Sequence, residues 1–254
     1  MALKKRLKSI IAIALIASSI GLMTTSIQVN AESGGISFQN NKLKATYPSN
    51  IVGFEANGMK FTGQSFLITD GVGNARGKAT VTGSVPVEAG KMGVSASIFD
   101  SKGVILHGTF YYYNEYKTQS FSYQTKSYYG GPTYAAGGAA RAVTGAQQYI
   151  TQTIPRTSQK TPFNYDEFDI SDEIRKEREF MFETKNMIPA LATNGKEGYI
   201  SIDEYIDVNP STPEEALAIQ KIRSDDYFEL INVYDAENNI IGKFKIETGQ
   251  AIYE

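Results

Sequence analysis

Alternating apolar and polar residues make the segment from Met92 to Tyr113 the clearest structural signal in the chain. Val94, Ala96 and Ile98 alternate with two serines, which is the two-residue period of a strand with one buried face. The next four residues, 100–103, suit a type I turn, because Asp favours its first position and Gly its fourth. The chain then runs back through β-branched and aromatic residues. The sequence therefore predicts a β-hairpin, and we expect the N-terminal sheet to be built around it.

The two-residue period recurs on both sides of this hairpin, with turn-forming residues between the segments. Further strands are predicted at residues 61–68, 78–87, 120–128, 134–143 and 148–154. The small residues of 134–143 indicate that a neighbouring element packs tightly over that strand. Short strands at this spacing predict a mainly β N-terminal domain, either an antiparallel sandwich or a barrel.

The C-terminal segment changes to a mixture of helices and hairpins. Ser171 is placed to cap a helix, and Thr212 caps another in which Pro213 is the first residue and Glu215 completes a capping box. The pair Asn194-Gly195 predicts a tight turn, and residues 228–246 predict a second hairpin. We therefore expect a small α+β domain after the β domain.

Charge divides the chain at about the same place. Residues 32–164 contain 12 Lys and Arg against 6 Asp and Glu, whereas residues 165–254 contain 9 against 21. A change of this size across a Pro- and Thr-containing stretch indicates two modules. The predicted organisation is a signal peptide at 1–31, a β-rich domain at 32–154, a linker at 155–168 and an acidic α+β module at 169–254.

The first residues predict export. Four basic residues precede the apolar segment 10–20, and Val29-Asn30-Ala31 places small residues at a cleavage site. We expect cleavage between Ala31 and Glu32, a secreted, extracellular protein and no stable membrane insertion after processing. The alternative is an uncleaved anchor, for which the apolar run is short. Without Cys the chain forms no disulfide and has no lipoprotein acylation site.

Several motifs near the C-terminus carry a resemblance. They are Ile188-Pro189-Ala190, Asn194-Gly195-Lys196-Glu197-Gly198-Tyr199-Ile200, Thr212-Pro213-Glu214-Glu215-Ala216-Leu217, Val233-Tyr234-Asp235 and Ile240-Ile241-Gly242-Lys243-Phe244-Lys245-Ile246. In this order they resemble a recurrent module of uncharacterised exported or membrane-tethered proteins of Gram-positive bacteria. The resemblance implies export and a small α+β domain, and it brings no catalytic residues. The N-terminal part more loosely resembles Tyr- and Gly-rich exported β-domains, some of them grouped with bacteriocin-like proteins.

The residue inventory restricts catalysis. There is no Cys nucleophile, and the single His, His107, rules out a zinc site with several His ligands. A Ser-His-Asp triad would have to use His107, but no nucleophile-elbow sequence accompanies it. We expect a surface or half-buried strand His, and we predict no catalytic residues.

Metal, phosphate and nucleic acid are not expected as ligands. The acidic runs 203–207 and 235–239 lack the spacing of a calcium loop, and the Gly-rich residues 71–77 lack the Lys-Ser/Thr pair of a phosphate loop. No cofactor and no metal site are predicted. The acidic charge of the exported chain and its extracellular location also disfavour nucleic acid.

A dense group of aromatic residues between residues 110 and 134 is the one feature that indicates a ligand. Strand parity places Tyr111 and Tyr113 on the face of His107, and we assign Leu106, Phe110 and Tyr112 to the core because they are more apolar as a group. The residues predicted to bind a ligand are Tyr111, Tyr113, Tyr123 and Lys126. Exposed Tyr rings stack on sugar rings or on a protein partner, whereas the alternative is that Tyr is simply a good strand former.

Two classes of function follow. The first is a secreted, non-enzymatic binding protein that acts at the bacterial cell envelope or on a target cell, with cell-wall glycan or a surface protein as partner. The second is a secreted, glycan-active hydrolase in which two carboxylates converge in space. A flat Tyr-rich face would favour the first class, and a deep cleft with two acids would favour the second.

Overall fold

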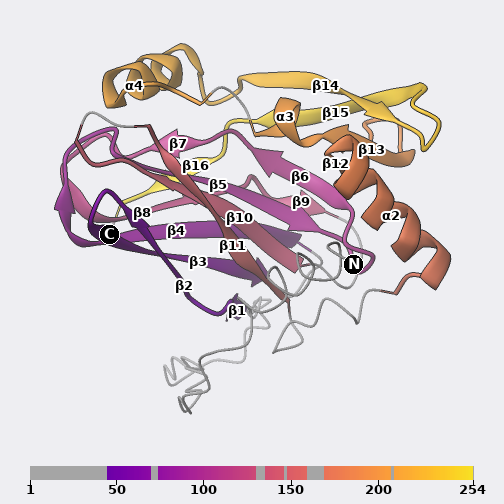
Figure 1. Ribbon diagram of the computed structural model, residues 1–254, viewed down its shortest axis with the longest axis horizontal. Coiled ribbons are helices and arrows are strands. Elements are labelled where there is room, and N and C mark those ends of the chain that lie inside the picture. The colour runs from indigo at the N-terminus through magenta and orange to yellow at the C-terminus, as the bar shows by residue number, and fades with distance from the viewer. Residues whose placement is uncertain are drawn as a thin grey trace, which may run out of the picture. The chain divides into compact units, whose positions relative to one another are not determined.

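Two β-sheets, of seven and nine strands, are formed by the residues that the structure describes (Figure 1). The structure is a computed structural model, and it describes residues 45–69, 74–129, 135–145, 148–158, 169–206 and 209–253. The predicted signal peptide and its cleavage site at Ala31 and Glu32 lie outside these residues.

The first sheet has the order β1-β3-β4-β8-β16, with β2 added to β3 and β9 added to β4. Its strands are β1 Ala45–Pro48, β2 Val52–Ala56, β3 Met59–Thr69, β4 Asn74–Val87, β8 Thr118–Gln124, β9 Tyr128–Tyr129 and β16 Gln250–Ile252. All the pairings in this sheet are antiparallel.

The second sheet has the order β11-β10-β5-β6-β12-β13-β14-β15, and β7 pairs with β5. Its strands are β5 Met92–Phe99, β6 Ile105–Thr109, β7 Tyr112–Tyr113, β10 Ala135–Ala142, β11 Ile150–Ser158, β12 Met187–Leu191, β13 Glu197–Ser201, β14 Phe228–Tyr234 and β15 Ile240–Glu247. Strand β15 pairs in turn with β6, so that β6, β12, β13, β14 and β15 close into a ring.

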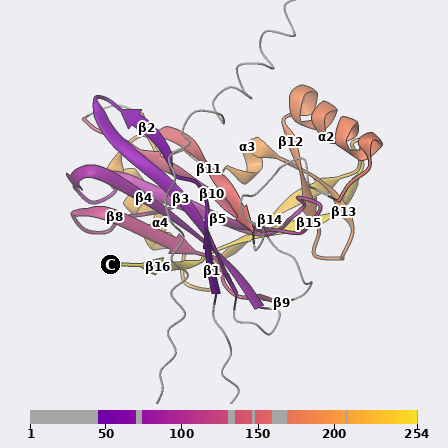
Figure 2. The ribbon, with the colours of Figure 1, turned by 90° about the horizontal axis from the view of Figure 1, so that it is seen from below.

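The first sheet packs face to face on strands β5, β10 and β11 of the second, and Figure 2 shows these strands from below. Val81 and Phe121 from one sheet meet Val94 and Ala140 from the other in a core without solvent access. Removing these side chains from water is the main force that holds the layers together. The predicted fold class, a mainly β sandwich or barrel with a small α+β part, is confirmed.

The predicted hairpin of Met92 to Tyr113 forms as β5 and β6, with one difference. The N–H of Gly103 donates to the carbonyl of Asp100 across the turn, and Gly103 adopts a positive φ of 83°. However, β5 is buried on both faces, whereas the alternation predicted one solvent-exposed face. The hydroxyl of Ser97 lies 2.5 Å from that of Tyr205, which covers the second face. The buried hydroxyl of Ser97 thus has a hydrogen-bond partner from the later helix that carries Tyr205.

Tight packing over residues 134–143 is also confirmed. Gly138 in β10 lies so close to β5 that an added Cβ would be 2.2 Å from the carbonyl oxygen of Ser95. No larger residue fits without moving a strand.

Three helices complete the described part of the chain: α2 Asp172–Lys185, α3 Ile202–Tyr205 and α4 Pro213–Ile222. The predicted caps are confirmed, because the side chain of Ser171 accepts from the N–H of Ile174 and that of Thr212 from the N–H of Glu215. The carboxylate of Glu215 accepts from the N–H of Ser211 at 2.6 Å, one residue before the N-cap position that the predicted capping box would use. These local bonds satisfy N–H groups that have no partner inside a helix.

The two predicted modules share a sheet and a hydrophobic core. Strands β12 and β15 pair in parallel with β6, and Ile105 belongs to one buried cluster with Ala190 and Phe244. The described residues all belong to a single compact unit, residues 41–254. Whether either module folds alone stays a prediction.

The predicted linker at 155–168 needs a correction. Its first four residues, 155–158, extend strand β11, which pairs with β10 up to Ser158. Residues 159–168 lie outside the described part of the chain.

Among the described residues, no helix is both long enough and apolar enough to cross a bilayer.

Candidate functional site

The predicted orientation of Tyr111 and Tyr113 is wrong. Their exposed fractions are 5% and 3%, and they pack with Tyr149 and with Ala216 of α4. Parity correctly separated two faces of this segment, but the face assigned to solvent is covered by α4. Rings in this position belong to the interior and are not available to a ligand in solution.

Polar contacts hold these two rings in the interior. The Arg141 guanidinium lies 3.7 Å from the centre of the Tyr111 ring, and its Nη1 donates to the Tyr113 hydroxyl at 3.0 Å. Arg141 is itself only 1% exposed, so these contacts replace part of its hydration. The other two predicted ligand residues also have contacts within the protein. Tyr123 is buried, with 1% of its surface exposed, and the Lys126 ammonium lies 3.5 Å from Oδ1 of Asp226.

Exposed tyrosines gather instead beside Glu115, just after this segment. We define the tyrosine cluster as Tyr112, Tyr116 and Tyr253, together with the carboxylate of Glu115. The Tyr116 and Tyr253 rings are 65% and 46% exposed, and their centres lie 5.7 Å apart at an interplanar angle of 62°. Two rings of this kind present apolar faces to solvent in different directions.

Tyr112 connects the cluster to the core. Its ring stacks on that of Tyr123, with centres 4.8 Å apart, and on that of Phe121 at 6.1 Å. The prediction that Tyr112 packs against the core is thus confirmed for its ring, which is partly buried. Its hydroxyl, by contrast, reaches the surface and donates to Oε1 of Glu115 at 2.9 Å.

Glu115 is the polar centre of the cluster. Besides Tyr112, its Oε1 accepts from Nε2 of Gln220 in α4 at 3.1 Å. Burial, followed by contact with Glu115, raises the pKa of both Tyr112 and Tyr253. Both hydroxyls therefore stay protonated at neutral pH and remain hydrogen-bond donors.

The side chain of Asn114 fixes the loop that carries Glu115 and Tyr116 from the protein interior. This side chain is fully buried, and its Oδ1 accepts from the N–H of Met92 at 2.9 Å. Its Nδ2 donates to the carbonyls of Glu88 and Tyr116, at 3.0 and 2.8 Å. A satisfied buried amide of this kind gives the loop one conformation.

Strand β16 brings Tyr253 into the cluster from the far end of the chain. It pairs antiparallel with β8, where Ala251 lies opposite Tyr123. The turn before it passes very close to β8, and the N–H of Gly249 donates to the Tyr123 hydroxyl at 2.6 Å. The cluster therefore combines the β7–β8 connection, α4 and the last strand.

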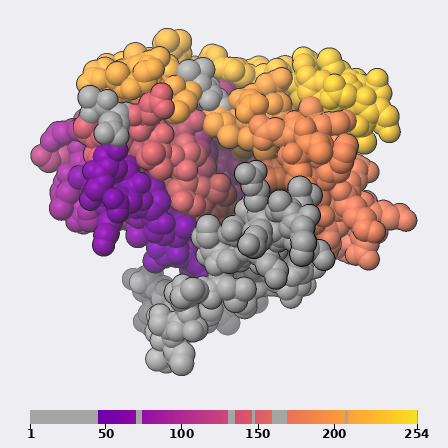
Figure 3. Space-filling model, in the orientation of Figure 1, coloured from indigo at the N-terminus to yellow at the C-terminus, as the bar shows by residue number. Residues whose placement is uncertain are grey.

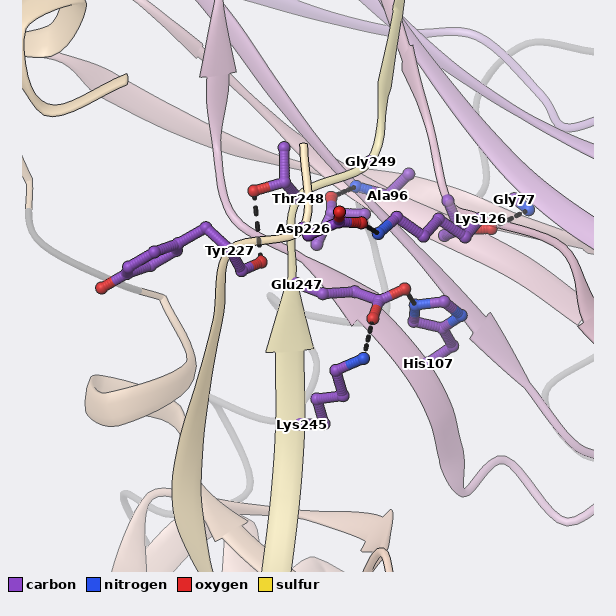
Figure 4. Close-up of polar contacts among 12 residues, drawn as sticks. Gly77, Ala96, His107, Lys126, Asp226, Tyr227, Lys245, Glu247, Thr248 and Gly249 are labelled. Atoms are coloured by element: carbon purple, nitrogen blue, oxygen red, sulfur yellow. Dashed lines mark hydrogen bonds and ion pairs between the residues drawn. The ribbon is translucent and has the colours of Figure 1, made fainter. Parts of the chain in front are cut away.

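His107 occupies a second polar group, shown in Figure 4. Its side chain is 13% exposed, and Nε2 lies 2.7 Å from Oε1 of Glu247, whose other oxygen accepts from Lys245. Burial alone would raise the pKa of Glu247, but the hydrogen bonds and charges of His107 and Lys245 lower it to about 2. This arrangement stabilises the junction between β6 and β15.

The described residues contain no metal-binding group, and no family is assigned by comparison. In the described part of the chain, no group of three or more Asp, Glu or His side chains is arranged to hold a metal ion. Comparison with protein-family models, with curated proteins and with solved structures finds no match to this chain. The resemblance of the C-terminal motifs to an exported module therefore stays a prediction.

Sequence reasoning missed Glu115, Gln220 and Tyr253 as members of one site. Tyr116 and Tyr112 were visible in the aromatic group, but no local pattern connects them to Tyr253, which directly follows a strand of only three residues. Only the pairing of β16 with β8 brings these residues together.

Proposed function

We propose that this chain is an exported, non-enzymatic binding protein that acts at the bacterial cell envelope or on a target cell, and that the tyrosine cluster contacts glycan there. Aromatic faces pack against the apolar C–H faces of sugar rings, and a carboxylate accepts hydrogen bonds from sugar hydroxyls. The observation that carries the proposal is the placement of exposed Tyr116 and Tyr253 around Glu115.

The residues beneath the tyrosine cluster are held in fixed positions, and this favours a binding function over a purely structural role for the rings. Asn114 holds the loop, and the Tyr112 ring is stacked on the core, so little side-chain freedom is lost when a ligand binds. Tyr116, by contrast, leaves most of its ring in water. A protein surface that exposes large aromatic rings in one place is typical of an interaction site.

Sedimentation with purified cell wall tests the proposal. Each stacked ring contributes on the order of 1 kcal/mol, so the double substitution of Tyr116 and Tyr253 to Ala should weaken binding roughly tenfold to a hundredfold. Tyr129→Ala is the matched control, because Tyr129 is 73% exposed and pairs with Asn74 at the opposite end of β4. Equal sedimentation of the double variant and the wild type would contradict the assignment of the cluster.

Export is tested separately. The predicted cleavage between Ala31 and Glu32 requires the protein in the culture medium to begin at Glu32, which intact-mass analysis measures. Finding residues 1–31 attached to the secreted form would contradict the signal-peptide prediction. This outcome is independent of glycan binding.

The alternative, a carboxylate-dependent hydrolase, receives less support. A general acid needs a raised pKa, and burial raises that of Asp100. However, Oδ1 of Asp100 accepts from the N–H groups of Lys102 and Val104, so this carboxylate shapes the β5–β6 turn. Release of reducing ends from purified wall would favour the hydrolase.

A further inference from the structure

A groove of about 260 Å³ lies between helix α2, the β5–β6 turn and the β12–β13 hairpin. Figure 1 shows α2 beside β12 and β13, and Figure 3 shows these orange elements at the surface of the molecule. The groove shares no residue with the tyrosine cluster. Its volume is below the roughly 300–1,000 Å³ that is usual for pockets of drug-sized ligands, so we expect a small ligand.

The groove combines an apolar side with charged groups of both signs. Val104, Ile174 and Pro189 supply apolar surface, and two cations and three carboxylates surround it. The cations are Lys102 and Arg178, and the carboxylates are Asp169, Glu177 and Glu197. This excess of carboxylate disfavours a ligand whose net charge is negative.

Arg178 is positioned to hold a carboxylate. Its Nη1 donates to the backbone carbonyl of Lys102, and its side chain also bonds to Tyr199. A guanidinium has five N–H donors in a planar fork, so two contacts leave capacity for a carboxylate. The contact to the Lys102 carbonyl fixes Arg178 across the groove, from α2 to the β5–β6 turn.

The carboxylates are positioned to hold an ammonium group. Oε1 of Glu177 accepts from the Tyr199 hydroxyl at 2.5 Å, which fixes this carboxylate at the groove while its other oxygen remains an acceptor. Glu197 lies 3.1 Å from the Lys102 ammonium, and both side chains are about half exposed, at 46% and 47%. Because an exposed ion pair contributes little to stability, a charged ligand displaces it at small cost.

We infer that this groove binds a small zwitterion, namely a free amino acid or a short peptide. The ligand carboxylate bonds to Arg178, the ligand ammonium bonds to Glu177 and Glu197, and a small side chain packs on Ile174 and Pro189. The partner of the carboxylate lies on α2, and the partners of the ammonium lie on α2 and β13. This inference does not depend on glycan binding.

Nuclear magnetic resonance titration of the full chain with dialanine tests the inference. We expect saturable shifts of the Gly198 and Lys102 amide signals, with a dissociation constant on the order of 1 mM for so small a ligand. N-acetyl-dialanine lacks the ammonium and dialanine amide lacks the carboxylate, so each should bind at least about tenfold more weakly.

Two variants locate the site. Arg178→Gln should weaken dialanine binding at least about tenfold, because the amide cannot replace a bidentate charged contact. Glu197→Gln, at an exposed position, should weaken it by a smaller factor while the fold is kept. Lys176→Ala, on an exposed part of α2 outside the groove, is the control and should bind as the wild type does.

Three results would overturn the inference. They are the absence of saturable shifts at these amides, equal binding of the blocked and unblocked peptides, and unchanged binding by a folded Arg178→Gln variant. If unfolding of Arg178→Gln is seen in its amide spectrum, the Glu197→Gln titration decides, and wild-type affinity there would also overturn the inference.

Discussion

Nε2 of His107 lies 2.7 Å from Oε1 of Glu247, and this contact joins β6 of the predicted N-terminal module to β15 of the predicted C-terminal one. The only His in the chain thus contacts a buried carboxylate, which also accepts from the partly exposed Lys245. Because Glu247 is buried, these two partners replace the water that its carboxylate loses on folding.

Glu247→Gln should destabilise the fold by about 2 kcal/mol, because a neutral amide weakens the contacts that His107 and Lys245 make to this buried position. Urea unfolding followed by circular dichroism measures the change. Glu237→Gln, at an exposed turn position, is the control and should change the free energy of unfolding by less than about 0.5 kcal/mol. An equal effect of both substitutions on the free energy of unfolding would show that the contacts of Glu247 with His107 and Lys245 add no stability.

The same carboxylate predicts an acid-dependent stability. Its pKa falls from 4.5 in the unfolded chain to about 2 in the folded one, because the bonds and charges of His107 and Lys245 outweigh the effect of burial. The stabilisation by ionised Glu247 is therefore complete above about pH 4.5 and is lost as pH falls toward 2.

We expect the free energy of unfolding to drop across this window in the wild type and to drop less in Glu247→Gln. Urea midpoints at a series of pH values measure the difference. Parallel curves for the two proteins would contradict the prediction.

Tyr111→Ala and Tyr113→Ala should each destabilise the fold by about 3–5 kcal/mol, since each removes a buried ring beneath α4. Tyr116→Ala should change stability by less than about 1 kcal/mol, because its ring is largely exposed. Thermal unfolding separates the two outcomes. Equal stability of Tyr113→Ala and Tyr116→Ala would mean that the buried position of Tyr113 is not maintained in solution.

Gly249→Ala should displace β16 and with it Tyr253. A Cβ at this position would lie 2.2 Å from the carbonyl oxygen of Gln124, a distance at which the backbone must move. We expect weaker wall binding than the wild type, and loss of the amide protection of Ile252, which lies opposite Ser122 of β8, in hydrogen exchange. Unchanged protection of Ile252 would show that the turn tolerates a side chain.

Unfolding should occur in one cooperative transition. Separable modules would give two transitions, whereas a sheet in which β6 pairs with both β12 and β15 couples them. Calorimetry distinguishes the two cases through the ratio of calorimetric to van't Hoff enthalpy. Two resolved transitions, or a folded fragment of residues 169–254, would favour independent modules.

The sequence by itself determined the features that depend on residues adjacent to one another along the chain. The hairpin turn at Asp100 to Gly103 and the helix caps at Ser171 and Thr212 follow from short hydrogen bonds and backbone preferences. The alternation along the strands likewise predicted a mainly β fold, because a period of two is a property of the extended chain itself.

Only the tertiary structure decided which strand face is covered and which distant residues meet. Parity separates Tyr113 from Tyr112, but α4 buries the first and leaves the hydroxyl of the second at the surface. The position of Tyr253 depends on β16 pairing with β8, and the partner of His107 comes from β15. These contacts join residues that are remote in sequence, and the free energy that selects them comes from packing of the whole chain, which no local pattern records.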